Sequence, residues 1–254
     1  MLKDGTNRRA FIRGGVVAFA AVPLGVGGTY GVKAGSNWRR MNAANRLISD
    51  YLHDHAIAKL QLGAGGVKGF SGWLNTDIEP AEGEAYLDAT KSFPISDGSL
   101  SYIFSEHLIE HLSYRDGLSM LQECRRTLKP GGRVRIATPN LLKLIQLFQN
   151  AKNDEMRNYV KDKIKADYYS EPLPQTASPE CVILNYEMRS WGHQFLYDPP
   201  SLRESLERTG FQSIKEFAPG ESDDPALTGL ENRHKLLFHE LNDYETMVFQ
   251  AVRP

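Results

Sequence analysis

The stretch that most constrains the fold of this chain runs from Lys59 to Pro80. It begins as a short apolar strand, breaks into a glycine-rich turn at 63–66, and resumes as a second strand, Trp73 to Ile78, with Asp77 near its end. Glycine at the tip of a strand lets the backbone approach a ligand closely. A carboxylate at the tip of the next strand can accept hydrogen bonds from ribose hydroxyls. The pattern therefore indicates a site for a cofactor that contains a nucleoside.

The spacing between the turn and the acid argues against one class of nucleoside cofactor. In the dinucleotide-binding fingerprint, the acid follows the glycines by roughly 20 residues, and the helix between them holds the pyrophosphate at its N-terminus. Asp77 follows Gly63 sooner than that, and the glycines at 66, 69 and 72 disfavour a helix. We therefore predict a loop or a very short helix here, and a cofactor other than a nicotinamide dinucleotide.

The rest of the chain alternates between strand and helix patterns. Helices are predicted at 37–55, 114–128, 138–148 and 199–209, and strands at 56–62, 73–78, 85–89, 100–105, 133–137, 211–217 and 244–251. Residues 129–132 are expected to form a helix-ending turn, and Pro139 to lie in the first turn of the following helix. Residues 221–235 read as a polar loop. This alternation predicts a mostly parallel sheet covered on both faces, with ligands at the carboxyl ends of its strands.

Composition excludes several functional classes. With 254 residues, of which 41% are hydrophobic, the chain can bury the core of one domain with extensions. Its formal net charge of −1 gives no polyelectrolyte signal, so nucleic acid is not expected as a partner. The two cysteines, Cys124 and Cys181, are too few for a disulfide framework or a cysteine-built zinc site. We expect both to be buried thiols.

Residues 1–35 are set apart from the predicted fold. Arg8 and Arg9 precede a charge-free run from Gly14 to Tyr30, and this pattern resembles a twin-arginine export signal. The alternative is a weakly structured arm or an interfacial anchor, because the run is rich in glycine and short for a span of about 20 strongly apolar residues. The folded domain is expected to comprise residues 36–254.

Five segments between Leu62 and Asn140 resemble the class I S-adenosylmethionine-dependent methyltransferases, in particular their type-11-like group. They are Leu-Gly-Ala-Gly-Gly at 62–66, Leu-Asn-Thr-Asp-Ile at 74–78, Asp-Ala-Thr-Lys-Ser-Phe-Pro-Ile-Ser-Asp-Gly-Ser at 88–99, Ser-Glu-His-Leu-Ile-Glu-His-Leu at 105–112 and Glu-Cys-Arg-Arg-Thr-Leu-Lys-Pro-Gly-Gly-Arg at 123–133. Looser similarity extends the resemblance over most of residues 56–251. It implies S-adenosylmethionine as the cofactor, and a Rossmann-like, doubly wound α/β sheet of seven strands with an antiparallel last strand.

The resemblance also implies roles for residues at the strand ends. The methionine part and the sulfonium would lie against Gly63, Ala64 and Gly65, the ribose would meet Asp77 and Ile78, and the adenine would meet Asp88 and Ala89. The methionine and acceptor side would be lined by Ser105, which is counted with the cofactor residues, and by Glu106 and His107. For Asp77 the alternative is an exposed strand-end carboxylate. For Asp88 it is a cap of the following turn.

His107 and Glu106 are the candidates for chemistry on the acceptor. Methyl transfer from a sulfonium is a displacement, so catalysis is mostly alignment, and a general base helps when the acceptor is a hydroxyl. The alternative for His107 is packing against the cofactor without proton transfer. Residues 152–197 are expected to be an inserted segment that covers the site. Four residues of this segment are candidates for binding the acceptor: Arg189, Trp191, His193 and Tyr197. The alternative for them is packing in the core or in the covering segment.

The segment from His107 to His111 also matches the His-x-x-Glu-His pattern of inverted zinc peptidases. Two histidines four apart on a helix can share a metal ion, with the glutamate as base. Here the pattern opens directly off a strand and no downstream acid completes it, so no metal site is predicted. A metal-dependent hydrolase that uses His107, Glu110 and His111 is kept as an alternative function.

The sequence thus predicts an S-adenosylmethionine-dependent methyltransferase that acts on a small-molecule or glycan-type acceptor, at oxygen rather than carbon. A catalytically silent, methyltransferase-like binding protein is a second alternative. Because the methyl donor is made inside the cell, we expect the protein in the cytoplasm or at the cytoplasmic face of the membrane, with association through residues 8–30. Export through the twin-arginine-like signal is the alternative, and the sequence does not indicate an oligomeric state.

Overall fold

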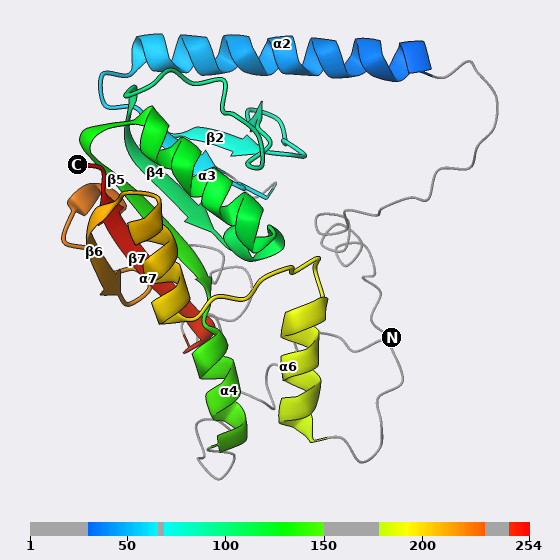
Figure 1. The fold of residues 1–254 in the computed structure, drawn as a ribbon. Helices are drawn as coiled ribbons and strands as arrows, with labels where there is room; N and C mark the ends of the chain where they lie inside the picture. The colour runs from blue at the N-terminus through cyan, green and yellow to red at the C-terminus, as the bar shows by residue number, and fades with distance from the viewer. Residues whose placement is uncertain (1–29, 66–68, 150–177, 232–243) are drawn as a thin grey trace, which may run out of the picture.

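The computed structural model describes residues 30–65, 69–149, 178–231 and 244–254 (Figure 1). The expected signal or anchor at 8–29, the glycine at 66 and residues 152–177 of the inserted segment lie outside the described residues. The first described helix begins at Tyr30, upstream of the domain start expected at residue 36. Across these four described ranges, no helix combines the length and apolar character needed to cross a bilayer.

Every predicted helix and strand is present with shifts at its ends, and the described residues add two 3₁₀ helices and a helix inside the inserted segment. In chain order the elements are α2 (Tyr30–Asp54), β1 (Lys59–Leu62), β2 (Leu74–Asp77), β3 (Ala85–Tyr86), β4 (Leu100–Glu106), the 3₁₀ helix η1 (Ile109–His111), α3 (Tyr114–Thr127), β5 (Leu128–Pro139), α4 (Leu141–Gln149), α6 (Pro179–Arg189), α7 (Pro199–Arg208), β6 (Gln212–Phe217), the 3₁₀ helix η2 (Pro225–Leu227) and β7 (Thr246–Val252). As predicted, the described residues between β1 and β2 contain no helix.

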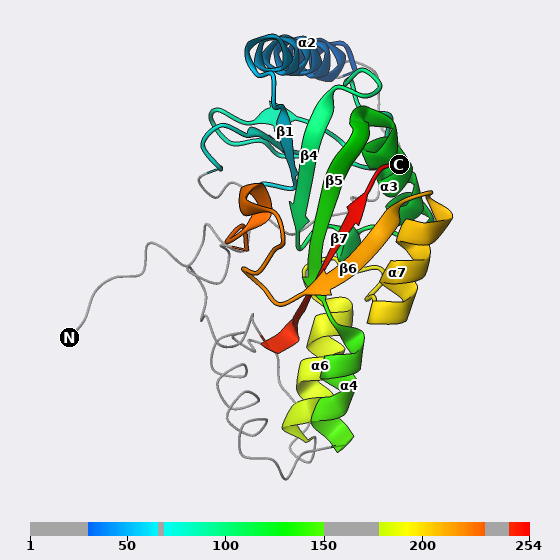
Figure 2. The same ribbon diagram turned by 90° about the vertical axis from the view of Figure 1, so that its left-hand side faces the viewer.

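The strands form one seven-stranded sheet in the order β3-β2-β1-β4-β5-β7-β6 (Figure 2). From β3 to β5 all neighbours pair in parallel, whereas β7 is antiparallel to both β5 and β6. This topology confirms the predicted Rossmann-like α/β sheet with an antiparallel last strand. The chain moves outward from β1 in one direction and from β4 in the other, so the point where the strand order reverses lies between them. Ligands of such sheets bind outside the carboxyl ends of the strands at that point.

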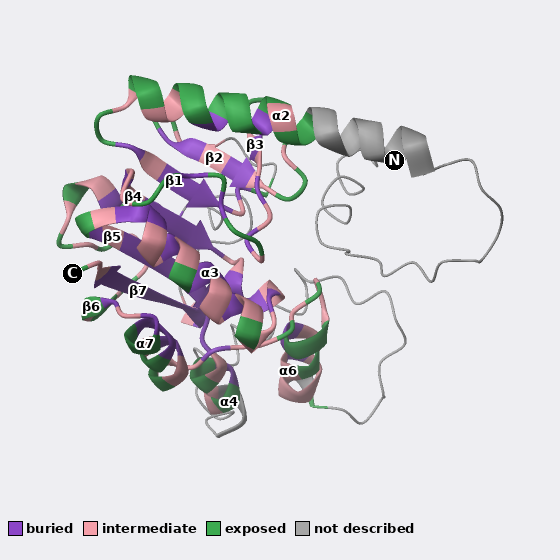
Figure 3. Cartoon of the chain, turned by 45° about the horizontal axis from the view of Figure 1, so that its top comes forward, coloured by how far each residue is buried: buried purple, intermediate pink, exposed green. Residues whose placement is uncertain are grey.

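Apolar side chains pack on both faces of the sheet. A large cluster lies on the side of α3 and α7 and includes Leu60, Cys124 and Leu206, each fully buried. On the opposite face, Phe104 packs with Leu227 in the loop that carries η2. The strands are therefore buried between two layers, as Figure 3 shows by the colour of the central strands. Cys124 is buried as expected, while Cys181 is only half-buried.

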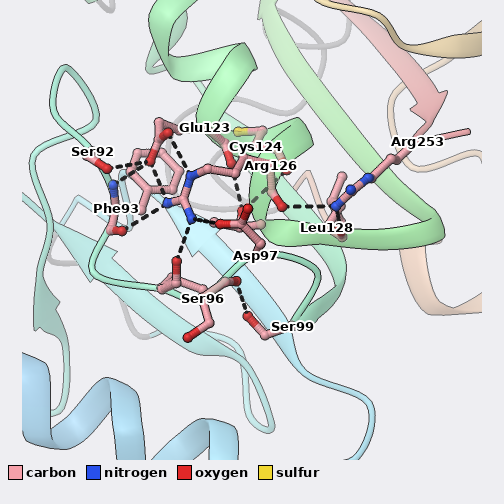
Figure 4. A network of polar contacts seen from close by, with 12 residues as sticks. Ser92, Phe93, Ser96, Asp97, Ser99, Glu123, Cys124, Arg126, Leu128 and Arg253 are labelled. Carbon is pink, nitrogen blue, oxygen red and sulfur yellow. Dashed lines mark hydrogen bonds and ion pairs between the residues drawn. The ribbon is translucent and has the colours of Figure 1, made fainter.

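Arg126 ties α3 to the loop that precedes β4 (Figure 4). Its guanidinium donates to the Asp97 carboxylate at 2.5 Å and to both oxygens of Glu123 at 2.7 and 2.9 Å. It also donates to the Phe93 carbonyl at 3.1 Å, and the Phe93 N–H donates to Glu123 at 2.7 Å. These bonds hold residues 93–97 against α3, within the connection that runs from Asp88 to β4.

Two predictions at the ends of β5 are wrong. Residues 129–132 belong to the assigned strand rather than to a separate turn; Gly131 has a φ of +77°, and the register with β4 shifts there. Pro139 is the last residue of β5 and pairs with Thr246, so it does not lie in the first turn of α4. Asn140 caps that helix, because its Oδ1 accepts a hydrogen bond from Leu142 N at 3.0 Å.

The predicted polar loop at 221–235 contains a buried ion pair in its described part. Arg135 of β5 donates from Nε and Nη2 to the two oxygens of Glu231, at 2.6 and 2.7 Å, and both side chains are fully buried. Glu231 also accepts a hydrogen bond from Gly220 N at 2.7 Å. The pair therefore anchors this loop to the sheet.

Candidate active site

The predicted cofactor residues gather at one edge of the sheet. Strand β1 pairs in parallel with β2 on one side and β4 on the other, so the carboxyl ends of the three strands lie side by side. This brings together the turn at 63–65, Asp77 and the segment 105–107. Asp88 follows β3, the next strand along, and Leu87 N donates to the carbonyl of Asp77 at 3.0 Å.

The glycine turn has a backbone that only glycine adopts readily. Gly63 and Gly65 both have a φ of +69°, in the left-handed region. A Cβ atom at position 63 would lie 3.2 Å from the side chain of Leu108, closer than an ordinary contact. The turn is held to β2 because Ala64 N donates to the carbonyl of Thr76 at 3.0 Å. A side chain at position 63 would thus be strained and would crowd this edge.

Asp77 shapes the glycine turn as well as ending β2. Its Oδ2 accepts a hydrogen bond from Gly65 N, and its Oδ1 accepts one from Glu79 N, both at 2.8 Å. A carboxylate has about four lone-pair sites, so two acceptor positions stay available for other donors. Asp77 is half-buried, whereas Ile78 beside it is 48% exposed. The geometry is compatible with a grip on two neighbouring hydroxyls.

Asp88 performs the capping role that was the alternative for it. Its Oδ1 accepts hydrogen bonds from both the N–H and the hydroxyl of Thr90, at 2.9 and 2.7 Å. Both bonds use the same oxygen, so Oδ2 keeps its acceptor capacity. Asp88 is half-buried and Ala89 is buried. Capping and ligand binding are therefore compatible at this residue.

His107 has a strained backbone at the end of β4. Its φ is +50°, which is uncommon for a residue other than glycine and is often found at functional sites. Its N–H donates to the carbonyl of Ala137 at 2.9 Å, and the ring Nδ1 lies 3.1 Å from Glu110 Oε1. Thr246 Oγ1 lies 3.5 Å from Nε2, and the side chain is 15% exposed. The ring is therefore positioned on both sides while keeping some access to solvent.

The two residues before His107 are buried. Glu106 is 3% exposed, and Ser105 is fully buried, with no hydrogen-bond partner for its hydroxyl among the described residues. A buried hydroxyl without a partner is costly. Ser105 thus offers a donor and an acceptor close to the carboxyl end of β4.

Glu110 is a buried carboxylate held by two residues. It accepts hydrogen bonds from His107 at Oε1 and from the hydroxyl of Thr138 at Oε2, the latter at 3.0 Å. Burial alone would raise the pKa of Glu110, but the hydrogen bond and charge of His107, with the charges of His111 and His193, lower that pKa to about 2. Glu110 is therefore ionised at neutral pH. The segment that contains it is a 3₁₀ turn, so the His-x-x-Glu-His pattern does not lie on an α-helix here.

The residues that follow α6 pack onto this 3₁₀ turn. Gln194 N and Phe195 N donate to the carbonyl of Glu110 at 2.8 and 3.2 Å, and Gln194 Nε2 donates to the carbonyl of His111 at 2.7 Å. His193 contacts His111 edge to face, with 4.7 Å between ring centroids. This brings His193, predicted as an acceptor residue, into the same cluster as Glu110.

The other acceptor candidates are placed less uniformly. Arg189 is exposed at the end of α6, and Trp191 stacks edge to face on Tyr186 at a centroid distance of 4.6 Å. Trp191 also has a left-handed φ of +54°. Tyr197 is fully buried against Phe195 in the large apolar cluster, which is the packing role considered as its alternative. Only part of the predicted set therefore lies where an acceptor could reach it.

Sequence reasoning missed several polar residues of this region. Thr138 is the last residue but one of β5 and donates to Glu110, and Thr246 begins β7 and lies 3.5 Å from His107 Nε2. Glu187 and Glu245 are buried, and Glu245 acts electrostatically on His193. Glu187 could have been found from the sequence, because an acidic residue on an otherwise apolar helix face indicates a buried carboxylate with a specific role.

Comparison with known protein families gives a match in the central segment. Residues 78–136 match a family model described as a methyltransferase domain. No curated protein sequence matched the chain.

Solved structures that resemble the chain do so at low identity. A Haemonchus contortus phosphoethanolamine N-methyltransferase 2 in complex with S-adenosyl-L-methionine is 16% identical, with a TM-score of 0.43. The similarity covers 83% of this chain and 52% of that one, so the chain spans about half the length of the Haemonchus protein. An S-adenosylmethionine-dependent methyltransferase from Archaeoglobus fulgidus is 16% identical, with a TM-score of 0.44 and coverage of 88% and 99%. One from Mesorhizobium loti is 13% identical, with a TM-score of 0.43 and coverage of 87% and 100%.

Proposed function

We propose that this chain is a class I S-adenosylmethionine-dependent methyltransferase and that it methylates a hydroxyl oxygen of a small-molecule or glycan-type acceptor. The observation that carries the choice of oxygen is the pair formed by His107 and Glu110 at the carboxyl end of β4, with 3.1 Å between Nδ1 and Oε1. A histidine backed by a buried carboxylate is a typical general base. Hydroxyl acceptors are the ones that benefit from such a base.

The residues at this edge fit the cofactor. Gly63 and Gly65 provide close backbone approach, since a Cβ at position 63 would meet Leu108. We assign Gly63, Ala64 and Gly65 to the methionine and sulfonium region, with Ser105 beside it, Asp77 and Ile78 to the ribose, and Asp88 and Ala89 to the adenine. When bound, the cofactor supplies a methyl group made electrophilic by the sulfonium. It carries no phosphate, which agrees with the lack of a helix after β1 in the described residues.

We assign His107 as the general base. The imidazole would donate from Nδ1 to Glu110, and Nε2, which lies 3.5 Å from Thr246 Oγ1, would accept the proton that an acceptor hydroxyl loses on methylation. Glu110 is a positioning residue: it holds the ring and stabilises its charged form. Glu106 is assigned to the acceptor side, where its buried carboxylate could accept a hydrogen bond from a second hydroxyl.

The acceptor would approach from the segment after α6. Arg189 and Trp191 offer a charge and an aromatic face for a sugar or planar group, and His193 lies beside the 3₁₀ turn. We leave Tyr197 out of this set because it is fully buried. Since the methyl donor is made inside the cell, we place the enzyme in the cytoplasm or at the cytoplasmic membrane face. Fractionation of cells that express a C-terminally tagged chain tests this, and a cleaved, exported product would contradict it.

The base assignment is tested with the variant His107→Gln. Purified protein is incubated with methyl-labelled S-adenosylmethionine and a panel of methyl glycosides, phenols and small amines, and the product is identified by mass spectrometry. We expect transfer to a hydroxyl compound, and His107→Gln should lower its rate by about 100-fold or more while the affinity for S-adenosylhomocysteine stays within about threefold, less than 1 kcal/mol. His53→Gln, on the exposed side of α2, is the matched control.

Three results would count against the proposal. Full activity of His107→Gln would refute the assignment of His107 as general base. Methylation of amines alone would refute the assignment of oxygen as the methylated atom. Binding of S-adenosylhomocysteine without transfer to any acceptor would favour the catalytically silent alternative.

A further inference from the structure

Three side chains from two distant parts of the chain converge beside η1. Ligand-type atoms of Glu110, His111 and His193 all lie within 4.8 Å of one another. Glu110 is fully buried and the two histidines are half-buried. The first two residues belong to η1, whereas His193 comes from the loop after α6, so only the folded chain brings them together.

Each of the three groups is oriented by a second partner. His193 Nδ1 bonds to the backbone carbonyl of Glu187, and the His111 ring bonds to the backbone of Trp191. One nitrogen of each imidazole therefore has a backbone partner, and the other makes no hydrogen bond among the described residues. Metal-binding histidines almost always donate their second ring nitrogen in this way, which fixes ring orientation and tautomer.

The carboxylate of the cluster is oriented as well. Glu110 is held by His107 at one oxygen and by Thr138 at the other. Hydrogen-bonded carboxylates are common among metal ligands, because each oxygen retains a second lone pair. The three groups together make a pre-arranged set of two imidazoles and one carboxylate.

We propose that Glu110, His111 and His193 bind a divalent transition-metal ion, best matched by Zn²⁺, with at least one coordination position left open. Two imidazoles and a carboxylate form a donor set that suits Zn²⁺ and not the hard cations Mg²⁺ or Ca²⁺. Zn–N and Zn–O distances of about 2.0–2.2 Å place tetrahedral ligand atoms roughly 3.3 Å apart, so the cluster must contract by about 1.5 Å or less.

The ligand set differs from the one that the sequence pattern suggested. In the His-x-x-Glu-His interpretation His107 would be a ligand, but its Nδ1 bonds to Glu110 and its Nε2 lies near Thr246. His193, rather than His107, is the second histidine of the cluster.

The site extends the proposed function without depending on it. The same cluster without an ion could serve only to hold the loop 190–195 against η1, through the bonds from Gln194 to Glu110 and His111. Metal binding by the isolated protein separates the two roles.

The test is a titration of the full, chelator-treated chain with Zn²⁺ and with Co²⁺, at pH 7.5. We expect one equivalent to bind in competition with a chromophoric chelator, and Co²⁺ to give the visible absorption of a tetrahedral site. His111→Ala and His193→Ala should each weaken Zn²⁺ binding by about 100-fold, because the loss of outer partners alone costs roughly 10–100-fold. His53→Ala should bind as the unmodified chain does, and Mg²⁺ should not compete.

Binding of S-adenosylhomocysteine is measured on the same samples as a test of folding, and His193→Gln replaces His193→Ala if the latter is unfolded. Absence of stoichiometric Zn²⁺ binding would overturn the proposal. So would binding that persists undiminished in folded His111 and His193 variants. Loss of Zn²⁺ binding with intact S-adenosylhomocysteine binding is the expected outcome for these variants, and failure to bind S-adenosylhomocysteine by the unmodified chain would count only against the methyltransferase proposal.

Discussion

Replacing Asp77 by Asn separates a cofactor-binding role from a purely structural one. In the folded chain the Asp77 carboxylate accepts Gly65 N at one oxygen and Glu79 N at the other, each at 2.8 Å. Asparagine has nearly the same shape but a single acceptor oxygen and no charge. One backbone N–H therefore loses its partner, and the ribose hydroxyls would lose a charged acceptor.

The two effects differ in size. Asp77 is only half-buried, and the N–H that loses its partner can turn to water, so we expect the free energy of unfolding to fall by about 1 kcal/mol. A bound ribose would donate two charge-assisted hydrogen bonds, each worth about 1.5–3 kcal/mol. If the remaining oxygen keeps part of that interaction, about 2–3 kcal/mol is lost, which weakens S-adenosylhomocysteine binding roughly 30- to 150-fold.

The assay pairs isothermal titration of S-adenosylhomocysteine with denaturant unfolding of the same preparations. Glu79→Gln is the matched control, because it removes the same charge from an exposed side chain two residues along. Its affinity should stay within about threefold of the unmodified chain, a change of less than 1 kcal/mol. An Asp77→Asn variant that is less stable but binds S-adenosylhomocysteine as tightly as before would refute the reasoning and leave Asp77 as a residue of the turn alone.

Three further predictions concern stability and the turn. Gly63→Ala and Gly72→Ala both place a side chain at positive φ, and each should lower the free energy of unfolding in denaturant by about 1–2 kcal/mol. Only Gly63→Ala should also weaken S-adenosylhomocysteine binding, because a Cβ at Gly72 has open space around it. Equal binding by the two variants would contradict this. Glu231→Gln leaves the buried Arg135 guanidinium without its carboxylate, so the free energy of unfolding in urea or heat should fall by roughly 3–5 kcal/mol. A fall of less than about 1 kcal/mol would show that water reaches the pair. Burial lowers the pKa of His111 and of His193 below the ordinary histidine value of 6.5, so near and below that pH the unfolded chain takes up protons that the folded chain does not. The free energy of unfolding of the metal-free protein should therefore fall between pH 7.5 and 5.5. A drop of the same size in a variant with both histidines replaced would contradict the assignment.

Much of the fold follows from local patterns in the sequence. The apolar runs around Leu60 and Ile103 predicted buried central strands, because a strand covered on both faces must be apolar along its length. The glycine turn and Asp77 could also be predicted together, because each is recognised from its residue type and its position at the end of a predicted strand. Pro139 was misplaced because its fixed φ suits both a strand end and a helix start, and the choice was made by pairing with β7.

The sequence by itself predicted the alternation of strands and helices, and it placed the glycine turn and Asp77 at the ends of neighbouring strands. Only the tertiary structure decided which distant groups share a buried environment. Arg135 meets Glu231, and Glu110 meets His193, because separate loops fold over opposite sides of the sheet. The hydrophobic pattern of a segment predicts which of its residues are buried. It does not predict which distant residue a buried charge pairs with, because the two residues come into contact only in the folded chain.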